Sequence, residues 1–253
     1  MESNYRFDPN NYEFNKNSKN GIYIIHGFSS TTYEVKQLSE FLGNSGFHAV
    51  ANNLPGHGTT VSQCNRVRYT DWLEQIKQDM AILSSKSEKI FVLGCSMGAV
   101  LALYAASVFP VKACIVGSTV LKFKNQFTID YINRFICKIF KIRKKKDHID
   151  KQKRQNKIKF YGYQEYPLIA LNEFRKLNKL IKKKLKNVTC PTLVIHSNND
   201  RLSLLENMDL VFDNIKSTKK KKMLVENAHH NLFDENNDQD VIFQKILKFL
   251  REN

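Results

Sequence analysis

The chain has 253 residues, of which 42% are hydrophobic and 25% charged, a composition typical of soluble globular proteins that excludes wholesale disorder and fibrous repeats. Lys and Arg outnumber Asp and Glu by 40 to 24, and the resulting net charge of +16 raises nucleic acid, an anionic membrane or an acidic substrate as partners. The five cysteines follow neither a disulfide nor a zinc spacing, so we expect a reduced, cytoplasmic protein without a metal site.

Apolar runs alternate with amphipathic stretches along most of the chain. They predict strands at 21–25, 47–54, 89–93, 111–116, 192–196 and 222–225. They predict helices at 33–45, 71–84 (with Thr70 as N-cap), 97–108, 204–212 and 240–250. This alternation indicates an α/β fold with a mostly parallel sheet flanked by helices. The uncharged run 90–111 is long enough to span a membrane, but its Gly, Ser and Pro residues favour a strand, a turn and a buried helix.

Residues 121–187 interrupt the alternation and are too long for a simple connection. Two amphipathic helices are predicted within them, at 129–140 and 168–185, with a Lys-rich stretch between. The segment holds 21 of the 40 basic and 5 of the 24 acidic residues, so it carries the whole charge excess and the rest of the chain is neutral. We therefore expect one domain over 1–253, with a small basic helical cap inserted at 121–187.

The clearest chemical motif, Gly94-Cys95-Ser96-Met97-Gly98, fits the GxSxG nucleophile elbow. A serine hydroxyl is a weak nucleophile, and a sharp turn between a strand and a helix exposes it to a base. Because a strand is predicted before the motif and a helix after it, we expect Ser96 to be the nucleophile. The alternative is a glycine-rich turn without chemistry. Cys95 is expected to point into the core.

An acid and a histidine are expected on later loops, in that order. Asp200 directly follows a predicted strand and is the predicted acid, with a turn or N-cap role as the alternative. His229 follows the next strand and is the predicted base, with its neighbour His230 as the alternative. The order serine, acid, histidine is that of the α/β-hydrolases. The backbone N–H groups of Phe28 and Met97 are expected to form an oxyanion hole.

Six motifs, HGFSS, LPGHG, TDW, GCSMG, CPTLVIHSNND and ENAHH, occur in this order between about residues 20 and 252. Together they resemble the bacterial carboxylesterase and monoacylglycerol lipase group of α/β-hydrolases. The resemblance implies the α/β-hydrolase fold with a short cap, carboxyl-ester substrates with acyl chains, and no metal or organic cofactor. It implies the same roles for the five residues assigned above. Relatives often have glycine in place of Ser30 and Ala228, and they generally carry a less basic cap.

The predicted function is hydrolysis of small acyl esters through an acyl-enzyme on Ser96. An acyl-protein or acyl-CoA thioesterase would use the same triad, and a non-catalytic lipid binder or basic adaptor is a further alternative. Nucleic acid is disfavoured, because the aromatic residues at 160–166 suit packing of the cap. The cap could lie on an anionic membrane, whereas the simpler expectation packs its apolar faces over an acyl pocket and leaves its lysines solvated. The oligomeric state is left open.

Overall fold

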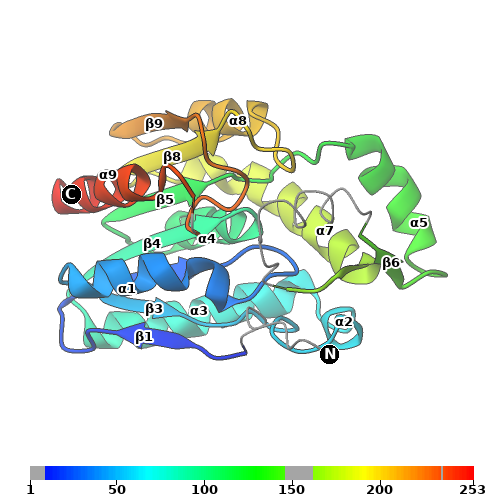
Figure 1. The fold of residues 1–253 in the computed structure, drawn as a ribbon, viewed down its shortest axis with the longest axis horizontal. Coiled ribbons are helices and arrows are strands. Elements are labelled where there is room, and N and C mark those ends of the chain that lie inside the picture. Colours follow the sequence, from blue (N-terminus) through cyan, green and yellow to red (C-terminus); the bar gives the residue numbers. More distant parts are fainter. Residues whose placement is uncertain (1–8, 146–161, 235) are drawn as a thin grey trace.

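A computed structural model describes residues 9–145, 162–234 and 236–253 (Figure 1). Its central sheet has seven strands in the order β1-β3-β2-β4-β5-β8-β9. All neighbouring strands pair in parallel except β1, which runs antiparallel to β3. The strands are β1 (Tyr12–Phe14), β2 (Asn20–Ile25), β3 (His48–Ala51), β4 (Lys89–Cys95), β5 (Ala113–Gly117), β8 (Thr192–Ser197) and β9 (Lys220–Val225). The predicted α/β fold with a mostly parallel sheet is confirmed.

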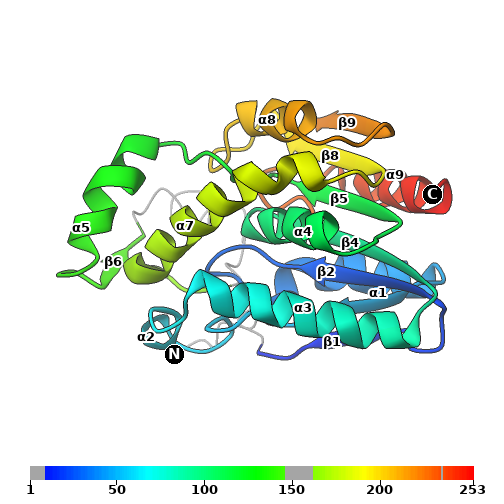
Figure 2. The same cartoon turned by 180° about the vertical axis from the view of Figure 1, so that it is seen from behind.

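Helices cover both faces of the sheet (Figures 1 and 2). One face carries α1 (Lys36–Asn44), which follows the short η1 (Thr32–Val35), and α9 (Gln239–Arg251). The other carries α3 (Tyr69–Lys86), α4 (Met97–Val108), α7 (Leu168–Lys184) and α8 (Glu206–Asn214). Each face of the sheet therefore has its own hydrophobic core, and successive side chains of one strand enter different cores. In β2, Ile22 and Ile24 pack in the core under α1 and α9, whereas Tyr23 and Ile25 pack in the core under α3, α4 and α7. Burial on both faces explains the continuous apolar runs that predicted these strands.

Two local features differ from the sequence prediction. α3 begins earlier than expected, and its N-cap is Arg68 rather than Thr70. The N–H group of Arg68 donates to the Asp71 carboxylate at 2.8 Å, so the acid at the third helical position sets the start of the helix. β1 and α2 (Val61–Cys64) were not predicted, because three or four residues are too few to show a period. The run 90–111 folds as strand, turn and helix, and no helix among the described residues is long and apolar enough to cross a membrane.

The insertion between β5 and β8 extends beyond the end of the sheet at which the parallel strands finish (Figure 1). It contains η2 (Thr128–Asn133, a π-helical turn), α5 (Arg134–Ile136), the antiparallel pair β6 (Ile142–Lys144) and β7 (Glu165–Pro167), then α7 and η3 (Leu185–Asn187). α7 packs as predicted, with Leu171, Phe174, Leu177 and Ile181 buried. The Lys-rich stretch predicted between the two helices lies largely at 146–161, outside the described residues.

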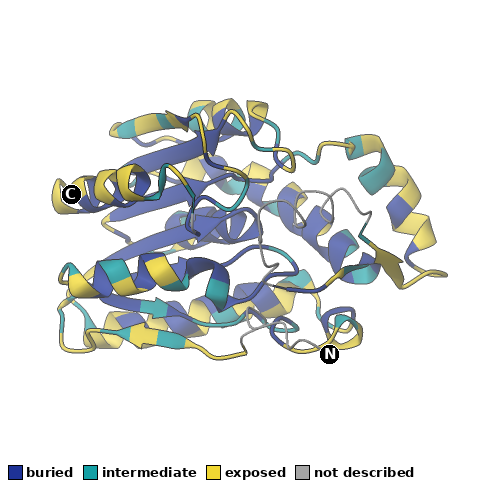
Figure 3. Ribbon diagram, in the orientation of Figure 1, coloured by how far each residue is buried: buried dark blue, intermediate teal, exposed yellow. Residues whose placement is uncertain are grey.

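The first predicted helix of the insertion, 129–140, contradicts the expected packing. Apart from Ile129, which packs against the core, its apolar residues and the preceding Phe127 are exposed rather than packed over an acyl pocket, and the ribbon of this segment is coloured mostly as exposed in Figure 3. Phe127, Tyr131, Phe135, Ile139 and Phe140 are each at least 60% exposed. The physical reason is that the helix is broken into short segments and only its opposite side, with Asn133 and Cys137, is buried.

Candidate active site

Ser96 occupies a strained turn between β4 and α4. Its backbone has φ 57° and ψ −115°, a conformation that is rare for a residue with a side chain and that clusters at functional sites. The two motif glycines are required by close approach: a Cβ on Gly94 would lie 2.1 Å from the Gly98 carbonyl oxygen, and one on Gly98 would lie 2.1 Å from that of Ile25. The sequence motif is therefore a tight elbow, and Met97 is the first residue of α4.

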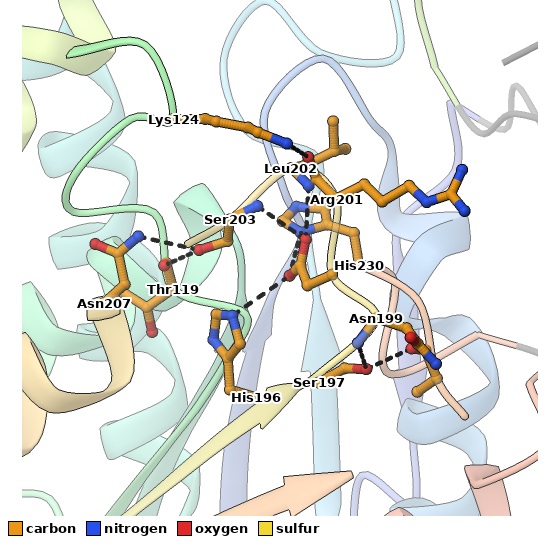
Figure 4. Close-up of polar contacts among 12 residues, drawn as sticks. Thr119, Lys124, His196, Ser197, Asn199, Arg201, Leu202, Ser203, Asn207 and His230 are labelled. Atoms are coloured by element: carbon orange, nitrogen blue, oxygen red, sulfur yellow. Dashed lines mark hydrogen bonds and ion pairs between the residues drawn. The ribbon is translucent and has the colours of Figure 1, made fainter. Parts of the chain in front are cut away.

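Asp200 follows β8 and contacts His230, which Figure 4 shows beside the loop that continues through Arg201, Leu202 and Ser203. Its two carboxylate oxygens lie 3.0 and 2.8 Å from Nδ1 of His230. Oδ1 also accepts the backbone N–H groups of Leu202 and Ser203, each at 2.8 Å. The Asp200 side chain is 0% exposed, and these donors hold it in one orientation. A carboxylate bonded to Nδ1 keeps the proton on that nitrogen and leaves Nε2 of the ring as the basic atom.

The histidine bound to Asp200 is not the predicted one. His229 is exposed, whereas Ala228 before it is buried and the His230 side chain is only 13% exposed. In this extended loop alternate side chains point inward, so His229 faces solvent and its neighbour faces the acid. The prediction that His229 pairs with the acid is therefore wrong, and the alternative, His230, occupies that position.

Asp200 and His230 shift each other's pKa toward the charged forms. Burial alone would raise the pKa of Asp200, but the charge and hydrogen bond of His230 and the two backbone donors lower it to about 2. Burial lowers the pKa of His230, yet the negative charges of Asp200 and Glu34 outweigh burial and raise it above its ordinary value. His230 is also tied to the elbow, because its carbonyl oxygen accepts from Cys95 Sγ at 3.8 Å. As expected, Cys95 lies in the core, where burial raises its pKa far above the ordinary value.

The loop after β2 passes beside the elbow. A Cβ on Gly27 would lie 3.2 Å from the Cβ of Ser96, so the loop that continues into Phe28 touches the elbow at Gly27. The Gly27 N–H group donates to Glu34 Oε2 at 2.6 Å, and the Ser29 N–H group donates to His57 Nε2 at 3.1 Å. The backbone is thus fixed on both sides of Phe28.

His26 and His57 are structural rather than acidic or basic groups. Nε2 of His26 accepts the Leu54 N–H group at 3.1 Å, and the two imidazole rings meet edge to face with centroids 5.1 Å apart. Burial lowers the pKa of His26 to about 3 and that of His57 to about 4. Both rings are therefore neutral at physiological pH and act as fixed acceptors for the loop.

Three residues near the site were not assigned a role from the sequence. Glu34 and His57 hold the loop around Phe28, and Tyr163 packs its ring against His57 with centroids 6.5 Å apart. His57 lies in the LPGHG motif, which is the one signal that could have identified it. Within the described part of the chain, no group of three or more His, Cys, Asp or Glu side chains is arranged to hold a metal ion.

Comparisons with known proteins identify the family and the fold of the chain. The chain is 26% identical over 238 residues to the thermostable monoacylglycerol lipase of Bacillus sp. (strain H-257), covering 94% of this chain and 93% of that protein. It is 20% identical to a carboxylesterase of Bacillus subtilis (strain 168), covering 94% of each. A structure from the study of LipS and LipT, two metagenome-derived lipolytic enzymes, has the same fold, with a TM-score of 0.88 at 23% identity over 97% of this chain and 98% of that one. The family model described as serine aminopeptidase, S33 (Hydrolase_4) matches residues 16–237. The resemblance to the carboxylesterase and monoacylglycerol lipase group is confirmed, and the chain belongs to the serine aminopeptidase S33 family of α/β-hydrolases.

Proposed function

We propose that this protein is a serine hydrolase that cleaves carboxylic esters of acyl chains, as a carboxylesterase or a monoacylglycerol lipase. One observation carries the proposal: a buried Asp200 bonded to Nδ1 of His230, on loops that reach the strained elbow of Ser96. Serine, acid and histidine in this chain order suit acyl transfer on this fold. The lipase and carboxylesterase relatives support ester substrates.

In the proposed mechanism, Nε2 of His230 takes the proton of the Ser96 hydroxyl as Oγ attacks the ester carbonyl. The imidazolium then returns a proton to the leaving alcohol, and water, activated by the same ring, releases the acyl group. Asp200 fixes the tautomer of His230 and stabilises its charge in both steps. The raised pKa of His230 suits a base that must accept a proton readily.

The developing oxyanion is assigned to the backbone N–H groups of Phe28 and Met97. Met97 begins α4, so its N–H belongs to the positive end of a helix dipole. Phe28 lies on the loop that Glu34 and His57 fix on either side. Fixed donors aimed at developing charge supply a large part of catalysis in such sites, and removal of one costs about 10²–10³-fold in kcat.

An ester series tests this function. We expect wild-type protein to hydrolyse p-nitrophenyl esters of several chain lengths and a monoacylglycerol, and Ser96→Ala to lose this activity. If Ser96→Ala keeps hydrolysis within a few-fold of wild type, the assignment of the nucleophile is wrong. Faster Ser96-dependent cleavage of an acyl-CoA than of any oxygen ester would replace the esterase with the thioesterase. An absence of Ser96-dependent turnover on every substrate would favour a non-catalytic binder.

We propose further that the insertion, residues 121–187, is a cap over this site. Phe174 of α7 packs on Phe28, with ring centroids 5.6 Å apart, and the N–H group of Tyr163 donates to the Ser29 carbonyl at 2.9 Å. The insertion therefore contacts the loop beside the nucleophile, where it can shape the acyl pocket. The five free thiols, four of them buried, support the cytoplasm as the expected compartment.

The exposed apolar side chains of this cap support reversible contact with an anionic membrane. Phe127, Tyr131, Phe135, Ile139 and Phe140, which we call the cap apolar patch, recur about every fourth residue and are at least 60% exposed. The exposed cations Arg134 and Lys138 lie between them in the sequence, and Lys141 follows directly after Phe140. Apolar side chains interspersed with cations suit insertion at the surface of a negatively charged bilayer. An esterase for lipids would meet its substrate there.

Vesicle binding tests this contact. We expect co-sedimentation with vesicles of equal phosphatidylglycerol and phosphatidylcholine, weakening as salt is raised. Phe135→Ser with Ile139→Ser should reduce binding at least about tenfold, because each side chain contributes roughly 1.5–3 kcal/mol when buried. Ile82→Ser with Val241→Ser, which removes two exposed apolar side chains elsewhere, is the matched control. Equal binding by both double variants, or no binding at low salt, would contradict the proposal.

A further inference from the structure

Ser29, the residue after the assigned oxyanion donor Phe28, is held at each of its polar groups. Its N–H group donates to His57 Nε2 at 3.1 Å. Its carbonyl oxygen accepts the Tyr163 N–H group at 2.9 Å, and its hydroxyl accepts from Lys145 Nζ at 2.9 Å. Its backbone has φ 58° and the residue is 3% exposed. A left-handed conformation at a residue with a side chain costs about 1–3 kcal/mol and persists only where the surroundings enforce it.

Two of these three partners come from the insertion. Lys145 and Tyr163 flank the β6–β7 pair at the same end, where the Lys145 N–H group donates to the Gln164 carbonyl at 3.2 Å. The ammonium group of Lys145 also lies 5.0 Å from the centre of the Tyr166 ring. One end of a two-stranded sheet therefore presents both a side-chain donor and a main-chain donor to Ser29.

This end of the insertion is anchored to the body of the protein and fits Ser29 tightly. The Tyr163 hydroxyl donates to the Gly56 carbonyl at 2.6 Å and accepts the Thr59 N–H group at 3.3 Å. A Cβ on Gly162 would lie 1.7 Å from the Ser29 carbonyl oxygen. Only glycine at position 162 allows the two backbones to approach this closely, so the contact has a defined geometry.

We propose that Lys145 and Tyr163 are positioning residues that set the direction of the Phe28 N–H group through Ser29, so that the insertion completes the oxyanion hole. The inference rests on the proposed function. An oxyanion donor works only within about 2.7–3.1 Å of the developing charge, and a misplacement of about 1 Å can cost 10²-fold in rate. The insertion then controls the rate of the chemical step as well as access to the site.

Lys145→Met tests this role, because methionine keeps an unbranched apolar side chain against Tyr166 but cannot donate. With a short soluble ester such as p-nitrophenyl acetate and no vesicles, we expect kcat to fall about 10- to 100-fold while KM stays within about twofold. Lys144→Met is the matched control, since it removes the same charge from the adjacent exposed residue and should keep near wild-type kcat. Lys145→Arg, which retains a donor, should recover most of the loss.

A double-mutant cycle with Ser29→Ala separates positioning from a general effect on the fold. If Lys145 acts through the Ser29 hydroxyl, the double variant should lose no more kcat than the more impaired single variant. The proposal would be overturned if the fold-losses in kcat of Lys145→Met and Ser29→Ala multiplied in the double variant. It would also be overturned if Lys145→Met had the same kcat as the control Lys144→Met. A fall in kcat matched by a fall in the thermal midpoint and not recovered by arginine would also overturn it. Ser96→Ala in the same assay distinguishes a failure of this inference from a failure of the proposed function. If ester hydrolysis survives Ser96→Ala, the proposed function itself is refuted.

Discussion

Replacing His230 with alanine tests which histidine is the base, and His229→Ala is its matched control. The two residues are adjacent and chemically identical, yet only His230 contacts Asp200, with Nδ1 at 2.8 and 3.0 Å from the carboxylate oxygens. His229 is exposed to solvent. A sequence motif alone treats the two alike, so the pair of variants isolates what the structure adds.

The structure sets the size of the expected effect. The pKa of Asp200 is about 2 against an ordinary 3.8 although burial raises it, so His230 and the backbone donors together favour the carboxylate by a net of roughly 2 kcal/mol at 1.36 kcal/mol per unit. Loss of the catalytic histidine from a serine triad costs about 10⁴–10⁶-fold in kcat. We therefore expect His230→Ala to lose at least about 10⁴-fold and His229→Ala to stay within about threefold of wild type.

The assay is kcat for a p-nitrophenyl ester, measured beside the thermal midpoint of each variant. His230→Ala leaves a buried carboxylate without its main partner, which costs about 1–3 kcal/mol of stability, so folding must be checked at the assay temperature. Added imidazole should restore part of the activity of folded His230→Ala, which a misfolded protein would not show. A large loss in His229→Ala with little loss in His230→Ala would refute the reasoning.

Three further predictions follow from the same geometry. The acid limb of kcat/KM should have its midpoint above pH 6.5, because the base must be neutral and Asp200 and Glu34 raise the pKa of His230; a pH–rate profile with a midpoint below 6.5 would contradict this. Asp200→Asn should lower kcat about 10⁴-fold while the protein stays folded, because the amide favours the wrong tautomer, and unchanged kcat would remove Asp200 from the site. Gly98→Ala should destabilise the fold by about 1–3 kcal/mol in urea unfolding, because its Cβ would lie 2.1 Å from a backbone oxygen, and unaltered stability would show that the elbow tolerates a side chain.

The sheet and the elbow could be predicted because their signals are local and continuous. Strands buried on both faces read as unbroken apolar runs, as in β4 and β8, and α4 follows the nucleophile motif with the predicted bounds. Ser96 and Asp200 could be found because Ser96 directly follows β4 and Asp200 lies in the loop just after β8. The charge could be located by counting alone, since +16 falls within residues 121–187.

The remaining features depend on contacts distant in sequence. The choice between His229 and His230 is decided by which side of a loop faces Asp200, 30 residues away. Lys145 reaches Ser29 across 116 residues, and no period or motif marks that contact. The exposure of the cap apolar patch was also hidden, because an amphipathic pattern predicts a helix with an apolar face and does not say what covers that face.

The most direct test of the proposed active site is covalent labelling with a fluorophosphonate, followed by mass spectrometry of the peptides. The probe reacts with a serine activated by a histidine and stabilised by an oxyanion hole. We predict that wild-type protein and His229→Ala gain one phosphonyl group on the peptide that contains Ser96, and that His230→Ala gains none over the same time. Absence of label on Ser96 in folded wild-type protein, or equal labelling of His230→Ala, would contradict the assignment of Ser96, His230 and Asp200 as the catalytic triad.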